Sequence, residues 1–249
     1  MKKQMARTLT EYPVWDRMVR WFHWINVLSV IALIAIGVAI LNSKALGVST
    51  DGKILLKTWH VYIGYVFAIN LAVRLFWTFI GNRFSRWAAI LPIGKKYKQQ
   101  RQMYLESINE GKPVGFAGHN PLARLMVTLL FILLTVQAVT GLVLGGTDVY
   151  MPPFGESFKA WVAESPQTEA LVEPYSKEGV NEAAYQQMRD FRSPFKEIHE
   201  IVFWLLSLAI ILHILGVVYS ELRERNGLVS AMFTGKKVFK DKPVDWDED

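Results

Sequence analysis

Four long apolar stretches interrupt an otherwise polar and charged chain, at residues 25–41, 61–81, 122–146 and 198–219. Each has about the 17 to 25 residues that an α-helix needs to cross a bilayer, and none alternates like a lipid-facing barrel strand. Backbone groups in lipid must be satisfied within their own segment. The pattern therefore predicts one all-α membrane domain over residues 1–249. We expect a four-helix up-down-up-down bundle, with helices at about residues 16–41, 58–81, 121–146 and 195–220.

Two dipeptides that end in proline favour the predicted starts of the third and fourth helices. Asn120 precedes Pro121, and Ser193 precedes Pro194. Both pairs have the sequence of a helix N-cap followed by proline in the first turn. They predict that the third and fourth helices begin there, with a long loop over residues 147–194.

The composition agrees with a membrane protein and narrows the possible chemistry. Hydrophobic residues make up 51% of the chain, and the mean hydropathy is +0.19. The sequence contains no cysteine. This excludes disulfides, thiolate zinc sites, iron–sulfur clusters and covalent c-type haem attachment. Any bound metal must use His, Met or oxygen ligands.

The distribution of Lys and Arg predicts the orientation. The N-terminal segment, the 82–120 loop and the C-terminal tail together hold 18 basic residues, and the other two connections hold 7. Because basic residues concentrate in cytoplasmic loops, we expect both termini in the cytoplasm and the 147–194 loop in the periplasm. The net charge of +6 is then a topology signal, and binding of nucleic acid is not expected.

Four of the five histidines lie in or at the ends of the apolar stretches: His23, His60, His199 and His213. The last two are 14 residues apart, a rotation of about 1,400°, which is about 40° short of four full turns. They therefore share a helix face at two depths. In the predicted topology His60 lies at the same depth as His199, toward the outer side of the membrane. His23 lies at the same depth as His213, toward the inner side.

Two stacked histidine pairs favour two b-type haems, because a planar macrocycle with two axial imidazoles fits between facing helices. The same 14-residue interval leads from His23 to Gly37, which leaves room for a flat ring, and from His60 to Arg74, whose charge would pair with a haem propionate. Hydrogen-bonded core histidines are the plainer alternative. Zinc is disfavoured because its ligands would have to lie together.

Three segments carry a family resemblance: RWFHWINVLSVIALIAIG from residue 20, EIHEIVFWLLSLAIILHIL around the last two histidines, and MFTGKK from residue 232. They resemble the b-type cytochrome subunit of nickel–iron hydrogenases and the related bacterial cytochrome b561 group. The segment GHNPLAR, residues 118–124, looks like members that pair with a di-haem cytochrome c. The resemblance implies a multi-pass protein of the bacterial inner membrane with two haems b, whose iron ligands are His23, His60, His199 and His213.

An iron with two histidine ligands has no open position for substrate, so the expected chemistry is transfer of single electrons. The predicted protein is an electron-transfer subunit of a quinone-linked respiratory oxidoreductase. It would connect the quinone pool with a periplasmic hydrogenase or di-haem cytochrome c, and a formate-dehydrogenase-like subunit is a third possibility. A non-haem membrane anchor or a proton-relaying transporter subunit is the alternative from another class.

Two further features bear on partners. The 147–194 loop has eight acidic and four basic residues, which suits docking of a periplasmic protein. Quinone contacts near the inner pair have weak candidates. For the arginines other than Arg74 the plainer interpretation is topology or lipid contact, and for His119 it is an ordinary loop residue. These candidates are Arg17, Arg20, Arg74, Arg124 and His119.

Overall fold

The computed structural model describes residues 9–111 and 114–246. Four of the basic residues counted for the orientation lie outside this part of the chain: Lys2, Lys3, Arg7 and Lys112. The chain forms two compact units. Unit 1 comprises Met1–Trp24, Ala72–Ile132 and Ser207–Asp249, and unit 2 comprises Ile25–Leu71 and Leu133–Leu206.

Within the described residues, four helices are long and apolar enough to cross a membrane: α1 (Arg17–Leu41), α2 (Thr50–Ile80), α5 (Pro121–Val149) and α7 (Glu182–Glu224). Each contributes one part to each unit. The helix α2 begins eight residues before the predicted start at residue 58. Ser49 accounts for this, because its hydroxyl accepts a hydrogen bond from the Gly52 amide at 3.1 Å, which is the bond of an N-cap.

The predicted start of the fourth helix is wrong. Pro194 lies inside α7, which begins at Glu182. Asn181 provides the cap instead, since its side-chain oxygen accepts the Ala184 amide at 3.0 Å. Proline within a helix removes the hydrogen bond to the carbonyl four residues earlier. That carbonyl belongs to Asp190, and both residues are exposed, so water can solvate it.

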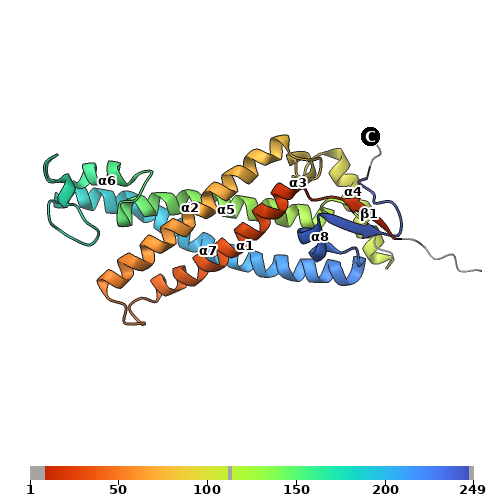
Figure 1. Cartoon of the computed structure of the whole chain (residues 1–249), viewed down its shortest axis with the longest axis horizontal. Coiled ribbons are helices and arrows are strands. Elements are labelled where there is room, and N and C mark those ends of the chain that lie inside the picture. The colour runs from red at the N-terminus through yellow and green to blue at the C-terminus, as the bar shows by residue number, and fades with distance from the viewer. Residues whose placement is uncertain (1–8, 112–113, 247–249) are drawn as a thin grey trace, which may run out of the picture. The chain divides into compact units, whose positions relative to one another are not determined.

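Unit 1 also holds three short helices, α3 (Trp87–Ile90), α4 (Gly94–Asn109) and α8 (Leu228–Thr234). The strand β1 (Thr10–Pro13) pairs antiparallel with β2 (Lys236–Phe239) (Figure 1). Thr10 lies opposite Phe239 in this pair. The core contains Val14, Trp15, Val19, Phe84, Ala117 and Ala231. The fold is thus mostly helical, with one small two-stranded sheet that the sequence pattern did not predict.

Unit 2 gives structure to the segment that the sequence predicted as a long loop. This segment contains α6 (Gly155–Val162) and a 3₁₀ turn, η1 (Glu169–Leu171), and it ends in the first turns of α7. Tyr150, Val162, Val172 and Met188 form its core. These contacts connect the segment to the end of α5 and to α7.

Candidate cofactor site

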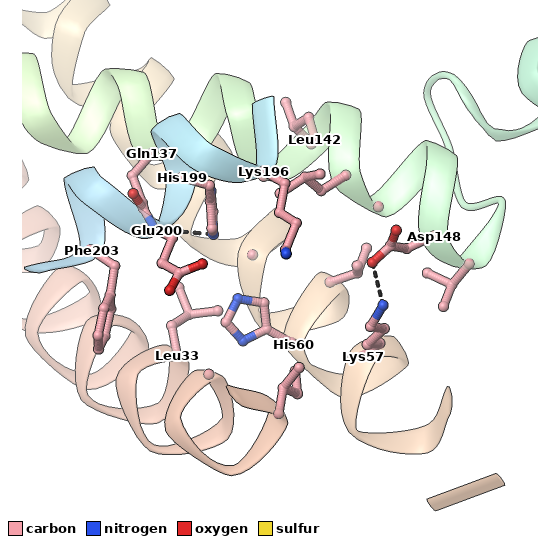
Figure 2. A pocket seen from close by; sticks show the side chains of 18 of the residues that line it. Leu33, Lys57, His60, Gln137, Leu142, Asp148, Lys196, His199, Glu200 and Phe203 are labelled. Carbon is pink, nitrogen blue, oxygen red and sulfur yellow. Dashed lines mark hydrogen bonds and ion pairs between the residues drawn. The ribbon is translucent and has the colours of Figure 1, made fainter. Parts of the chain in front are cut away.

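The rings of His60 and His199 lie close together in unit 2, in an edge-to-face arrangement. Their centroids are 6.4 Å apart and their planes meet at 71°, and Figure 2 shows both rings directed into the same pocket from α2 and α7. The Nδ1 atom of His60 is buried and has no hydrogen-bond partner among the described residues. A buried ring nitrogen without a partner is costly unless something else binds this side chain.

Two side chains of α5 hold His199. Thr140 Oγ1 lies 2.8 Å from Nδ1, and the Gln137 amide nitrogen lies 3.0 Å from Nε2 (Figure 2). The Thr140 hydroxyl donates its single proton to the Val136 carbonyl, 2.8 Å away, so it accepts a hydrogen bond from Nδ1–H. The Gln137 amide group donates to Nε2. These two contacts assign the proton of His199 to Nδ1, and the Nε2 lone pair accepts the hydrogen bond from Gln137.

A cavity of about 490 Å³ opens around the two rings. Its body is apolar, and it includes glycines on the helices that flank the histidines. A Cβ at Gly37 would lie 3.5 Å from His60 Cε1, and a Cβ at Gly141 would lie 3.2 Å from His199 Cε1. Side chains at these two positions would therefore fill the space beside the rings.

Charged side chains gather at one end of the cavity. Asp148 pairs with Lys57 of α2 and with Arg192 of α7, and Lys57 also lies 5.2 Å from the ring centre of Tyr175. Figure 2 shows the ammonium of Lys196 directed into the pocket. No acidic partner or hydrogen bond of Lys196 is found within the described residues.

The second pair, His23 and His213, lies in unit 1. The two side chains are close enough to interact electrostatically. The Nδ1 atom of His23 is buried and has no partner among the described residues. Its ring stands edge-on to Trp24 at 5.2 Å, and Trp24 in turn donates to the Met232 carbonyl at 3.1 Å. Met232 of α8 thus fixes the position of Trp24, the residue next to His23.

Arg74 is buried in the same unit, with 3% of its surface exposed. One guanidinium nitrogen donates to the Ser85 carbonyl at 3.2 Å. The guanidinium carbon lies 5.8 Å from the ring centre of Phe22 and 5.4 Å from that of Phe131. No other hydrogen bond of Arg74 is found within the described residues, and there most of its five donors are available to an anion.

His119 lies between α4 and α5, and its ring is half-buried while its Nδ1 atom has no access to solvent. The ring packs 4.8 Å from that of Trp15. Burial and then the charge of Lys237 lower the pKa of His119 to about 3, so the imidazole is neutral at pH 7. The buried Lys237 ammonium donates to the carbonyls of Phe116 and Gly118, at 3.2 and 2.9 Å.

The remaining quinone candidates are placed less favourably. Arg20 donates to the Phe233 carbonyl, and Arg124 donates to the carbonyls of Ala88 and Leu91. Arg17 is exposed. The hydrogen bonds of Arg20 and Arg124 give these two side chains a structural role.

The residues around His60 and His199 fit a bis-histidine haem. With their ring centres 6.4 Å apart, the two imidazoles would hold one iron between them. The cavity is apolar with a few polar groups, as cofactor sites are. Sequence reasoning had not paired Thr140 or Gln137 with His199, and it had overlooked Gly141 and the basic end of the cavity.

Four apolar helices define a helical membrane protein, and the histidine-lined apolar cavity is its candidate cofactor site. The family model described as prokaryotic cytochrome b561 matches residues 14–235. The chain belongs to this family, and it is therefore a membrane-integral cytochrome of the b type.

Curated relatives cover most of the chain. A probable Ni/Fe-hydrogenase B-type cytochrome subunit of Rhodobacter capsulatus is 25% identical over 251 residues, which cover 97% of this chain and 87% of that protein. The corresponding protein of Cupriavidus necator is 25% identical over 236 residues, with 92% and 87% covered. A probable Ni/Fe-hydrogenase 1 B-type cytochrome subunit of Escherichia coli K12 is 27% identical over 154 residues, 57% of this chain and 63% of that one. No solved structure matches the chain.

Proposed function

We propose that the chain binds two haems b, one held by His60 and His199 and the other by His23 and His213. The observation that carries the proposal is the pair of adjacent rings, 6.4 Å apart, in an apolar cavity with space for a flat macrocycle. His199 has its Nε2 lone pair directed at the Gln137 amide, and ligation would replace that hydrogen bond. Gly37 and Gly141 would leave room beside the two rings.

A haem with two axial histidines supplies one-electron transfer and keeps no position open for substrate. The residues of this chain would bind it, orient it and exclude water from it. Thr140 fixes the tautomer of His199, while apolar side chains on four helices line the cavity. Arg74, buried in unit 1 with donors to spare, would hold a propionate of the inner haem.

We further propose an up-down-up-down bundle with both termini in the cytoplasm, in the inner membrane of a bacterium. The support is the excess of Lys and Arg in the segments assigned to the cytoplasm. In this orientation His60 and His199 lie toward the periplasm. His23 and His213 lie toward the cytoplasm, where the neutral His119 is a candidate for hydrogen bonding to a quinone carbonyl.

The proposed role is electron transfer between a periplasmic redox protein and the quinone pool. The names of the relatives favour a nickel–iron hydrogenase as the partner. A di-haem cytochrome c is the second candidate, since it was suggested by the GHNPLAR segment.

Optical spectroscopy and haem analysis test this function. The purified protein should show the sharp α-band of a low-spin haem b after reduction, and pyridine haemochrome analysis should return two haems per chain. A redox protein should co-purify from the native membrane. A membrane anchor or a proton-relaying subunit would show no haem absorption, and that result would refute the proposal.

A further inference from the structure

Basic side chains precede both histidines of the cavity in unit 2 with the same spacing. One lies seven residues and another lies three residues before each histidine: Lys53, Lys57 and His60 on α2, and Arg192, Lys196 and His199 on α7. Residues at these intervals share a helix face, and they rise about 10.5 Å and about 4.5 Å along the axis. All six line the cavity. The two helices thus place four cations at the same end of it, one and two turns from the rings.

The charges at the cavity do not cancel. Four basic and two acidic side chains line it, which leaves an excess of two positive charges. Asp148 is shared by Lys57 and Arg192, so one carboxylate serves two cations. The second acidic residue, Glu200, follows His199 directly, and Figure 2 shows it on the side of Phe203, away from Lys57 and Asp148.

We propose that this basic end is a binding subsite for the two carboxylates of the haem held by His60 and His199, and that Lys196 is its principal cation. The inference rests on the proposed function. A haem b has one edge with two carboxylates and is otherwise apolar, and the cavity likewise has one basic end and an apolar body. The excess of two positive charges matches the charge of that edge.

Lys196 is assigned the main role because Lys57 and Arg192 are already engaged and because Lys53 lies about two helical turns from His60, farther than Lys196 lies from His199. Asp148 holds Lys57 and Arg192, and in both pairs the side chains are mostly buried, with at most 23% exposed. The Lys196 ammonium points into the pocket instead (Figure 2). Charge-assisted hydrogen bonds to carboxylates are about twice as strong as neutral ones, so this contact contributes to both affinity and orientation.

The test varies the charge on the ligand and the charge on the protein together. The full chain with His213→Ala, which removes the inner pair, is reconstituted with haem b and with the dimethyl ester of haem b, whose two carboxylates are uncharged. We expect tighter binding of haem b than of its ester, by about tenfold. In Lys196→Gln this preference should fall to about threefold or less, and in Lys196→Arg it should be retained. Lys177→Gln is the matched control, because Lys177 lies in the same outer segment and its side chain is 92% exposed.

A second measurement follows the redox potential of the bound haem. Positive charge favours the reduced iron, so Lys196→Gln should lower the midpoint potential and Glu200→Gln should raise it. If haem binds to every variant but Lys196→Gln keeps the full preference over the ester, the subsite is wrong and the proposed function stands. If the chain with all four histidines binds no haem, the proposed function itself is wrong.

Discussion

Thr140→Val tests how the protein orients a proposed axial ligand. The substitution conserves shape, so it leaves no cavity, but it removes the oxygen that accepts Nδ1–H of His199 at 2.8 Å. Thr140 is only 4% exposed, so water cannot easily replace that oxygen. Leaving a buried donor without a partner costs about 1 to 3 kcal/mol. The affinity for the outer haem should therefore fall by about fivefold to about 150-fold.

The redox potential of the outer haem should change as well. A hydrogen bond from Nδ1–H makes the imidazole a more basic ligand, and a more basic ligand favours oxidised iron. Without that bond the midpoint potential should rise, by roughly 40 mV if the difference is about 1 kcal/mol for one electron. A purely structural role for Thr140 would not shift the potential in this direction.

The assay is a redox titration with haem quantification on purified wild-type and variant proteins. Thr147→Val is the matched control: Thr147 is also 4% exposed and also on α5, and its hydroxyl donates only to backbone carbonyls, at 3.1 and 3.4 Å. Thr140→Ser, which keeps the hydroxyl, should restore both properties. Equal behaviour of Thr140→Val and Thr147→Val would refute the assigned role of the hydroxyl.

Three further predictions concern charge. Arg74→Leu should lower the midpoint potential of the inner haem, because it removes a buried positive charge. An unchanged midpoint potential in the redox titration would mean that Arg74 does not interact with that haem. The lowered pKa of His119 means that the unfolded chain takes up a proton below pH 6.5 while the folded chain does not, so stability is lost as pH falls. Between pH 6.5 and pH 5 this loss should be about 2 kcal/mol in the wild type and smaller in His119→Gln, as measured by denaturant unfolding. Electron exchange with the proposed periplasmic partner should slow as salt increases and when four acidic residues are neutralised, while the spectra of the two proposed haems stay intact. Stopped-flow rates that do not respond would instead favour a permanent apolar interface. These four residues are Glu156, Glu164, Glu169 and Glu173.

The membrane helices were predictable because each contains a long apolar window that few other structures tolerate. The start of α7 was not, because the dipeptide Ser193–Pro194 imitates a helix start. The true signal was Asn181 followed by a run of helix-forming residues, which sequence reasoning did not weigh. The pairing of β1 with β2 joins residues more than 220 positions apart, and a four-residue strand that contains Pro13 has no distinctive local pattern.

In the candidate site, too, local spacing along a helix was predictable from the sequence, and the orientation of a neighbouring helix was not. The interval of 14 residues is a local property of a helix, so it could predict that His199 and His213 share a face. The rotation of α5 about its own axis could not be predicted in the same way, because that helix has no histidine to orient it. Thr140, Gln137 and Gly141 therefore emerged only from the structure. The repeated spacing of Lys or Arg before His60 and His199 was visible in the sequence and would have indicated the basic end of the cavity.

The most direct test of two separate haem sites is the haem content of four single variants. His60→Ala and His199→Ala should each lose the same haem, and His23→Ala and His213→Ala should each lose the other, as distinguished by midpoint potential and counted by pyridine haemochrome analysis. The wild type should contain two haems per chain. A wild-type content of one haem or none, or the loss of the same haem in His23→Ala and His60→Ala, would contradict the account.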